Sequence, residues 1–325
     1  MTAPAPMRVL AFLPVYGPAD PTGAFVTTRE YLQALAAGGH LVHVVTSLAE
    51  PGQPRTDEGV SVWPLPYWWQ TAQELKPELV ITHHGDRRAA KLVPQLGTVP
   101  QLLMVHGMAR DRNLRRPRLA WFPSQACRDH YAYRGPSLVL PPAINPDRYR
   151  TTPGQMIALN GSTRAKGAHV LSAIAERIPE LPFLVVRSAG HPAGPFPPNV
   201  SVIDRLPPRE LYARTRLLLM PSATESYGRV GVEAMLSGIP VIASPLAGMC
   251  EAFGEAAVYV SPEDIDGWVR EIRRLSAPRA YATASARAKA HVAVLDYPGN
   301  LAEFEAACLS LRSRHAAARG LGLSR

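Results

Sequence analysis

The segment from Leu217 to Ser244 constrains the fold more than any other part of the chain, because its pattern predicts a strand, a polar loop, a helix, a turn and a strand in succession. Leu217 to Met220 is an unbroken apolar run that ends at Pro221, which is typical of a parallel strand buried on both faces. Gly238 and Pro240 end the helical pattern, and the apolar run after them predicts the next strand. Such a unit predicts an α/β fold with a parallel sheet.

Two carboxylates lie in this unit, one in the loop at Glu225 and one inside the helix at Glu233. Open α/β sheets bind ligands at the carboxyl ends of their strands, where helix N-termini attract phosphate. Gly228, Arg229 and Val230 would present the amides for that purpose. A carboxylate inside the helix can accept two hydrogen bonds from a ribose diol, as acidic residues do in other α/β folds. The pattern therefore predicts a nucleotide site.

The motifs of this unit resemble those of the retaining nucleotide-sugar glycosyltransferases of family 4. The matching features are Pro221-Ser222, Glu225, Gly228, Glu233-Ala234-Met235, Gly238, Pro240-Val241 and the spacing Glu-x7-Glu. The resemblance implies that Glu233 holds the donor ribose, that Glu225 lies at the transferred sugar and that the helix amides bind the diphosphate. It also implies two Rossmann-like domains that face a cleft, the glycosyltransferase B type. It covers nearly the whole chain and is most specific in the second half.

Four positions outside this unit match the same family. Lys166 matches a Lys-Gly pair at the diphosphate, and Arg164 is a substitute for an arginine that the family carries earlier in a longer loop. His106 follows a predicted strand, and the resemblance places it at the transferred sugar; the alternative is an ordinary loop histidine. Gly23 lies in the first strand-to-helix turn, where it either lets a backbone amide approach the donor or simply permits a tight turn.

The length of 325 residues predicts about two domains. A polar stretch with proline and glycine from Asn145 to Gly154 places their boundary near Arg150. We expect a Rossmann-like domain on the acceptor side at 1–150 and a nucleotide-sugar-binding domain at 151–298. Residues 299–325 are expected to form a helix that packs back on the first domain, as the resemblance implies.

The formal net charge of +9 favours an anionic partner, a description that fits a nucleotide diphosphate, a nucleic acid and an anionic lipid equally. With the motifs above, we expect a nucleotide sugar and no nucleic acid. The densest basic run, Arg110 to Arg118, is interpreted as a solvated loop, with an anionic acceptor or a peripheral contact with the inner membrane face as alternatives. Three cysteines without metal-ligand spacing predict reduced thiols in a cytoplasmic protein, and we expect neither a signal peptide nor a membrane span. Frequent alanine, arginine and proline suggest a bacterial source.

Three clusters have more than one interpretation. The run His83-His84-Gly85-Asp86 lacks a third metal ligand, so we interpret it as a loop that lines the cleft. Asp264-Ile265-Asp266 follows serine and proline, which indicates a helix N-terminus rather than a metal site. The aromatic run Tyr67-Trp68-Trp69 is either core packing or an acceptor platform. We therefore expect no metal.

Together these features predict a retaining glycosyltransferase that moves a sugar from a nucleotide diphosphate to an unidentified small-molecule or envelope acceptor. We expect His106, Glu225 and Lys166 at the reacting centre, and no cofactor apart from the donor substrate. Lys166 and the helix amides would stabilise the leaving phosphate without a metal. The alternatives are a nucleotide-sugar phosphorylase or epimerase on the same scaffold and a non-catalytic basic binding protein. The sequence does not specify the base, the sugar, the acceptor or the oligomeric state.

Overall fold

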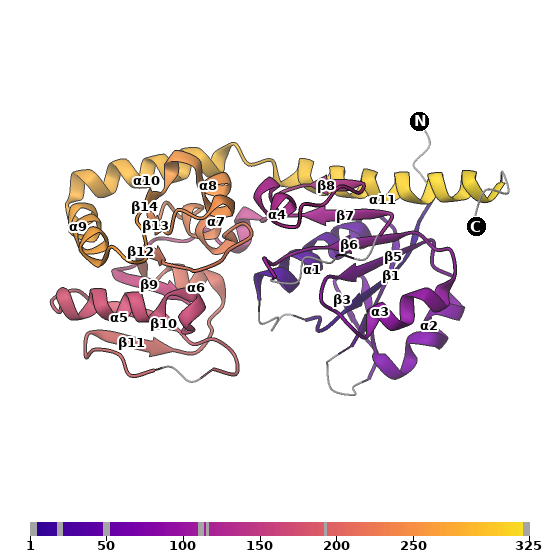
Figure 1. Ribbon diagram of the computed structural model, residues 1–325, viewed down its shortest axis with the longest axis horizontal. Helices are drawn as coiled ribbons and strands as arrows, with labels where there is room; N and C mark the ends of the chain where they lie inside the picture. Colours follow the sequence, from indigo (N-terminus) through magenta and orange to yellow (C-terminus); the bar gives the residue numbers. More distant parts are fainter. Residues whose placement is uncertain are drawn as a thin grey trace. The chain divides into compact units, whose positions relative to one another are not determined.

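Figure 1 shows the computed structural model, which describes residues 5–17, 22–47, 53–109, 114, 117–191 and 194–320. The chain divides into two compact units, the first made of Met1–Ala143 with Tyr297–Arg325 and the second of Ile144–Asp296. Each unit contains one mainly parallel sheet with helices on both faces. The predicted α/β class with two Rossmann-like domains is confirmed.

The sheet of the first unit has eight strands in the order β3-β4-β2-β1-β5-β6-β7-β8, and only the edge pair β3 and β4 is antiparallel among its described strands. The strands are β1 (Arg8–Leu13), β2 (Leu41–Thr46), β3 (Arg55–Asp57), β4 (Val60–Pro64), β5 (Leu79–His83), β6 (Gln101–Met104), β7 (Leu119–Phe122) and β8 (Ser137–Val139). The helices are α1 (Gly23–Ala37), η1 (Leu65–Tyr67), α2 (Trp68–Leu75), α3 (Ala89–Leu92), η2 (Val93–Leu96), α4 (Gln125–His130) and α11 (Tyr297–Gly320).

Successive residues of β1 point to opposite faces of this sheet, as the pleat of a strand requires. Val9 and Ala11 pack into the core that contains residues of α1 and α11, whereas Leu10 and Phe12 pack against α2 and α3. Because β1 is buried on both faces, its sequence is a continuous apolar run rather than an alternating one.

Helix α11 completes the first unit although it follows the second unit in the sequence. Phe304 and Cys308 are fully buried in the core shared with α1 and β1. The ring of Phe304 stacks on that of Tyr31, with 4.3 Å between the ring centroids. This helix therefore covers apolar surface that α1 alone leaves open.

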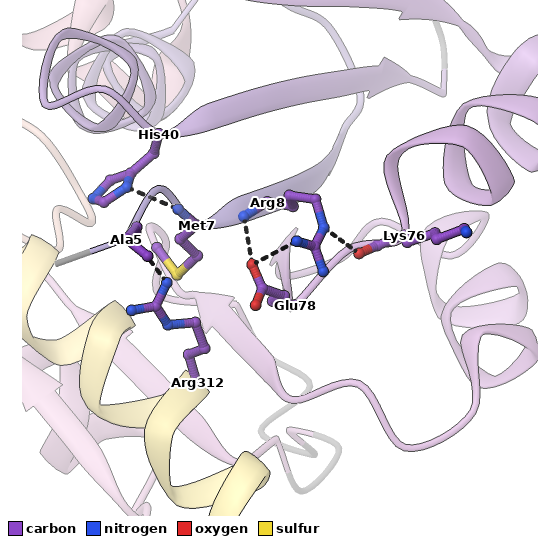
Figure 2. A network of polar contacts seen from close by, with 7 residues as sticks. All are labelled: Ala5, Met7, Arg8, His40, Lys76, Glu78 and Arg312. Carbon is purple, nitrogen blue, oxygen red and sulfur yellow. Dashed lines mark hydrogen bonds and ion pairs between the residues drawn. The ribbon is translucent and has the colours of Figure 1, made fainter.

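Polar contacts hold the same helix at the amino end of β1. His40 Nδ1 accepts the Met7 amide at 3.1 Å and its Nε2 lies 3.0 Å from Glu305 Oε1, so Nε2 carries the proton and donates to α11. Arg312 donates to the Ala5 carbonyl at 2.8 Å. Figure 2 shows this contact and that of His40 with Met7, together with the neighbouring pair of Arg8 and Glu78.

The second unit has a six-stranded sheet in the order β11-β10-β9-β12-β13-β14, in which all described neighbours are parallel. Its strands are β9 (Met156–Asn160), β10 (Phe183–Val186), β11 (Val200–Ile203), β12 (Thr215–Met220), β13 (Val241–Ala243) and β14 (Val258–Tyr259). Its helices are η3 (Pro146–Arg148), η4 (Arg164–Lys166), α5 (Ala168–Arg177), α6 (Pro208–Tyr212), α7 (Arg229–Met235), α8 (Ala247–Phe253), η5 (Gly254–Ala256), α9 (Ile265–Ser276) and α10 (Pro278–Ala293).

The predicted strand-helix-strand unit is present as β12, α7 and β13, with β12 and β13 paired in parallel. Residues of α7, α8 and α10 cover one face of the sheet, and residues of α5 and α9 cover the other. The units divide between Ala143 and Ile144, earlier than residue 150, because Ile144 and Tyr149 are already buried in the core of the second unit.

Candidate functional site

The loop between β12 and α7 is shaped by Gly228, the N-cap of α7. Its backbone has φ of +90°, a conformation that side chains other than glycine rarely adopt. A Cβ atom there would lie 2.7 Å from Phe253 Cζ and 2.9 Å from Met249 Cγ, both on α8. Glycine therefore lets α7 begin in close contact with α8, and Gly228, Arg229 and Val230 form its first turn, where backbone amides lack helical acceptors.

A second loop, between β9 and α5, packs against the first. Gly167 has φ of +84°, and a Cβ atom on it would lie 2.3 Å from the carbonyl oxygen of Pro221. The Ala223 amide donates to the Ala165 carbonyl at 2.9 Å, which joins the two loops. Both loops follow the carboxyl ends of neighbouring strands, β9 and β12, where α/β sheets bind ligands.

This packing brings two predicted site residues into contact. Lys166 Nζ forms an ion pair with Glu225 Oε1, and Ser222 Oγ donates to the same oxygen at 3.2 Å. The Lys166 side chain is 41% exposed, whereas that of Glu225 is 14% exposed. The loops thus present an accessible cation held beside a largely covered carboxylate.

Glu233 is held in a separate, buried group of polar side chains. Arg229 Nε donates to Glu233 Oε1 at 2.6 Å, and Tyr212 Oη donates to Glu233 Oε2 at 2.8 Å. Arg229 Nη2 also donates to Tyr149 Oη at 2.5 Å. Burial, and next the charge of Glu233, raise the pKa of Tyr212 well above its ordinary value, so this hydroxyl stays neutral and keeps its proton to donate.

The remaining predicted residue of the second unit is Arg164. It lies in η4, one turn from the N-terminus of α5, and is exposed. The pKa of His169 is lowered first by burial of the imidazole and then by the positive charge of Arg164. Arg164 and Lys166 therefore make the η4 loop locally basic.

His106, in the first unit, lies just beyond the carboxyl end of β6. Its Nε2 is 2.8 Å from Thr28 Oγ1, and that hydroxyl donates to the Ala24 carbonyl at 3.1 Å. Because the hydroxyl has a single proton, His106 Nε2 carries a proton and donates to it. The structure thus connects His106 to the first turn of α1, which begins at the exposed residue Gly23.

Two further histidines accompany His106. The ring of His83 stacks on those of His106 and His84 at centroid distances of 5.0 and 5.2 Å. Burial lowers the pKa of His83, and burial together with His83 lowers the pKa of His84 to about 4. These two imidazoles are therefore neutral at pH 7, and the carboxyl edge of the first sheet presents uncharged nitrogen groups.

Each group of predicted residues is brought together within its own unit. Lys166 and Glu225 are in direct contact, as are Arg229 and Glu233, while His106 and Gly23 belong to the first unit. Sequence reasoning missed Tyr212 and Tyr149 because they lie 21 and 80 residues from the groups that they bind. No spacing rule connects residues so far apart.

The clusters with several interpretations also have defined places. Asp86 accepts from the amides of Arg88 and Ala89 at 3.0 Å and so caps the start of α3. Asp264 is the N-cap of α9 and accepts the Gly267 amide at 2.8 Å, which confirms the helix N-terminus interpretation. In the described part of the chain, histidine, cysteine and acidic side chains nowhere gather into a group of three that could hold a metal.

Two features bear on contact with a membrane, the basic run and the helices. The basic run from Arg110 to Arg118 lies largely outside the described residues, which include only Leu114, Pro117 and Arg118 of it. No helix in the described part of the chain is both long enough and apolar enough to cross a bilayer.

Comparison with known proteins shows which class of fold this chain has. Residues 162–277 match the family model Glycosyl transferases group 1, and this segment contains Lys166, Glu225 and Glu233. Sucrose-phosphate synthase from Thermosynechococcus elongatus has a similar structure, with a TM-score of 0.80, 17% identity and coverage of 94% of this chain and 100% of that one. Anabaena HepE in complex with UDP-glucose matches with a TM-score of 0.74, 17% identity and coverage of 93% and 99%. The fold is the glycosyltransferase B type, and the predicted resemblance to that class is confirmed.

Curated relatives match shorter segments. The D-inositol 3-phosphate glycosyltransferase of Corynebacterium urealyticum is 30% identical over 137 residues, 34% of this chain and 32% of that protein. The O-antigen chain mannosyltransferase RfbU of Salmonella typhimurium is 35% identical over 65 residues, 20% of this chain and 18% of that protein. These matches thus span a third or less of either relative. The assignment to family 4 within the class stays a prediction.

Proposed function

We propose that the protein is a glycosyltransferase that moves a sugar from a nucleoside diphosphate to an acceptor hydroxyl with retention of the anomeric configuration. The observation that carries the proposal is the contact of Lys166 with Glu225 beside the first turn of α7. It places a cation, a carboxylate and helix amides at the carboxyl edge of a parallel sheet. That combination suits a ligand with both a diphosphate and a hydroxylated sugar.

In this proposal the diphosphate lies against Lys166 and the first-turn amides of α7, with Arg164 as a second cation. The bond between the anomeric carbon and the phosphate oxygen breaks, and its electron pair stays on the diphosphate. The acceptor oxygen bonds to the same face of that carbon, and its proton passes to the leaving phosphate oxygen. Lys166 and the amides stabilise the negative charge that develops, and fixed donors of this kind are worth about 10²–10³-fold in rate.

The two carboxylates have different tasks. Glu225 is 14% exposed and keeps Lys166 in place, so we assign it to the hydroxyls of the transferred sugar next to the diphosphate. Glu233 is a buried residue of α7 and is assigned to the nucleotide ribose. Gly23 and His106 of the first unit are assigned to the donor diphosphate and the transferred sugar.

Several findings support the choice of donor. The family match covers every proposed donor-binding residue of the second unit, from Arg164 to Glu233. HepE, which shares the fold, has been solved with UDP-glucose and with UDP.

The three cysteines are free thiols, in keeping with a reducing compartment such as the cytoplasm.

The test measures the release of nucleoside diphosphate from UDP-, GDP-, ADP- and dTDP-sugars, with and without a panel of sugar, polyol and lipid-linked acceptors. Lys166→Met and Glu225→Gln should lower turnover at least a hundredfold. Lys289→Met and Glu255→Gln, on exposed residues of the same unit, should leave it unchanged. The anomeric configuration of the product, read by NMR, tests retention.

The same assay separates the other candidates. We expect activity to persist in excess EDTA, since Lys166, Arg164 and helix amides can replace a metal at the diphosphate. Loss of activity with EDTA and its recovery with Mg²⁺ would refute metal independence. Donor breakdown or isomerisation that needs no acceptor would favour a phosphorylase or epimerase. Polyanion binding with no nucleotide affinity would favour a non-catalytic basic protein.

A further inference from the structure

A pocket of about 430 Å³ lies in the second unit, away from the two loops that contain Lys166 and Glu225. It is lined by Val241 and Val258, the first residues of β13 and β14. Because the described strands of this sheet are all parallel, the amino ends of these two strands lie at the edge opposite the carboxyl ends of β9 and β12. The pocket is therefore a separate feature, and its volume is within the range of about 300–1,000 Å³ that small-molecule sites occupy.

Small side chains leave this space open. Ala277 lies in the turn between α9 and α10 (Figure 1), and Ala280 and Ala284 follow on α10. Residues four apart lie on the same face of a helix, so the methyl groups of Ala280 and Ala284 line the pocket together. With the two valines they form an apolar wall, which suits a ligand with a compact apolar body.

Three arginines also line the pocket, and none of its lining residues is acidic. Arg274 comes from α9, whereas Arg279 and Arg287 come from α10. At a rise of about 1.5 Å per residue, the Cα atoms of Arg279 and Arg287 are about 12 Å apart, so their long side chains can reach one anion from two sides. Cations beside an apolar wall concentrate a positive field and raise the local concentration of anions.

The contacts of these arginines leave donors for a ligand. The side chain of Arg279 is exposed and has no ion pair or hydrogen bond with any residue that the structure describes. Arg287 donates to the Glu255 carbonyl at 3.4 Å, a long hydrogen bond. Arg274 Nε donates to Glu271 Oε2 at 2.7 Å, and its terminal nitrogens have no acceptor in the described part of the chain. A guanidinium presents its N–H donors in a planar fork that matches the oxygens of a phosphate or a carboxylate.

Of these two anions, a phosphate monoester matches the pocket better. A carboxylate offers one negative charge and two oxygens, whereas a phosphate monoester offers about 1.5 to 2 negative charges at pH 7 and three terminal oxygens. Three guanidinium groups supply more charge and more donors than one carboxylate can accept.

We propose that this pocket is a second ligand site, which binds a phosphate monoester with a compact apolar body. The phosphate lies on Arg274, Arg279 and Arg287, and the body lies against the alanines of α10. This inference does not depend on the proposed function, because the pocket shares no residue with the loops of Lys166 and Glu225. The same chemical group occurs on soluble metabolites and on phosphatidic acid, so the two sources are tested separately.

Titration calorimetry at low salt measures the binding of phenyl phosphate, which combines the phosphate with an aromatic body. The wild type should bind it about tenfold more tightly than inorganic phosphate, which lacks the body, and than benzoate, which lacks the phosphate. Arg279→Met should weaken this binding about tenfold, because a hydrogen bond to a charged group is lost. Arg273→Met, on an exposed arginine of α9 outside the pocket, should leave it unchanged.

The apolar wall is tested by a second pair of variants. Ala280→Leu fills the space for the body, so it should weaken phenyl phosphate about tenfold and leave inorganic phosphate unchanged. Ala282→Leu, exposed on the same helix but outside the pocket, is the matched control. In protein labelled at its alanine methyl groups, phenyl phosphate should shift the NMR signals of Ala277, Ala280 and Ala284.

Two results would overturn the inference. Loss of phenyl phosphate binding in Lys166→Met, with binding kept in Arg279→Met, would place the ligand in the other site. Equal affinity for phenyl phosphate and inorganic phosphate, unchanged in Arg279→Met, would show a general attraction of anions to a basic protein.

Co-sedimentation with phosphatidylcholine vesicles, with and without phosphatidic acid, separates the two sources of the phosphate monoester. Vesicle binding that requires phosphatidic acid and weakens in Arg279→Met would identify the lipid as a ligand. Binding of phenyl phosphate without vesicle binding would identify a soluble metabolite. Binding in neither experiment refutes the site, whether or not the protein transfers sugars.

Discussion

The imidazole of His84 is held neutral by its surroundings, and this has a consequence for stability. Its pKa is lowered from 6.5 to about 4, first by burial and then by the neighbouring His83. The unfolded chain therefore binds more protons than the folded one between these two values. Stability should be full above pH 6.5, should fall as the pH drops through this window, and should level off below about pH 4.

We predict that His84→Asn removes part of this dependence. The full effect of His84 is about 3 kcal/mol at most, from about 1.4 kcal/mol per pKa unit. Urea unfolding of the wild type between pH 8 and 4.5 should show the loss, and His84→Asn should show a smaller slope. His191→Asn, on an exposed histidine, is the control. An identical slope in both variants would contradict the prediction.

Gly167 gives a second prediction at a single residue. Gly167→Ala adds a Cβ atom 2.3 Å from the Pro221 carbonyl at a positive φ, so we expect a loss of about 2–4 kcal/mol in unfolding free energy. Gly190→Ala has a similar φ of +72° with open space around it, and should cost about 1–2 kcal/mol. Denaturant unfolding of both variants measures the difference, which isolates the contact between the two loops.

The residues of the site were predictable to different degrees. Glu225, Lys166 and Glu233 stand in short motifs, so their types and spacing were enough to single them out. The inward turn of Arg229 was not predictable, because it depends on Tyr212 and Tyr149, which approach only in the folded unit. The stack of His83 on His106 likewise needs β5 and β6 to be neighbours in the sheet.

Secondary structure elements followed local signals closely. The apolar run before Pro221 became β12, and the expected helix and strand after it became α7 and β13. The aromatic run after β4 was interpreted as core packing or as an acceptor platform, and its rings differ. Trp68 packs against Phe12 in the core, whereas Tyr67 and Trp69 are 39% and 46% exposed. Local pattern predicts the element, whereas the side on which a ring lies depends on its tertiary neighbours.

The start of α9 offers a prediction at the scale of an element. Asp264→Ala removes the side chain that accepts the Gly267 amide, so we expect a loss of about 1 kcal/mol in stability. Asp266→Ala removes an exposed carboxylate paired with Arg177 and should cost less than about 0.5 kcal/mol. Thermal unfolding with and without EDTA measures both. A metal site would instead show a large effect of EDTA and similar costs for the two variants.

For the whole molecule, the notable feature is that the first unit is built from two distant parts of the sequence. Phe304→Ala removes a fully buried ring stacked on Tyr31, and should lower the unfolding free energy of the first unit by about 3–4 kcal/mol. Glu303→Ala, one residue earlier and exposed, should have little effect. Hydrogen exchange can assign the change to the first unit, and equal protection in both variants would contradict the packing described here.

A chain that ends at Asp296 should show more strongly that the stability of the first unit depends on α11. Its first unit lacks α11, so the core around Tyr31 is open to water, whereas residues 144–296 keep their own sheet and cores. We expect the second unit to unfold cooperatively in this shortened chain and the first to aggregate or lose protection. Limited proteolysis followed by mass spectrometry measures which of the two persists.

This arrangement also sets an order of events during synthesis. Translation at about 5–20 residues per second needs roughly 8 to 30 s to make residues 144–296, which separate the first sheet from the helix that seals it. Throughout that interval the nascent sheet exposes the apolar residues that Phe304 and Cys308 later cover. The second unit, encoded without interruption, can finish folding first, so the N-terminal half of the polypeptide matures last and is the part that a ribosome-associated chaperone would shelter.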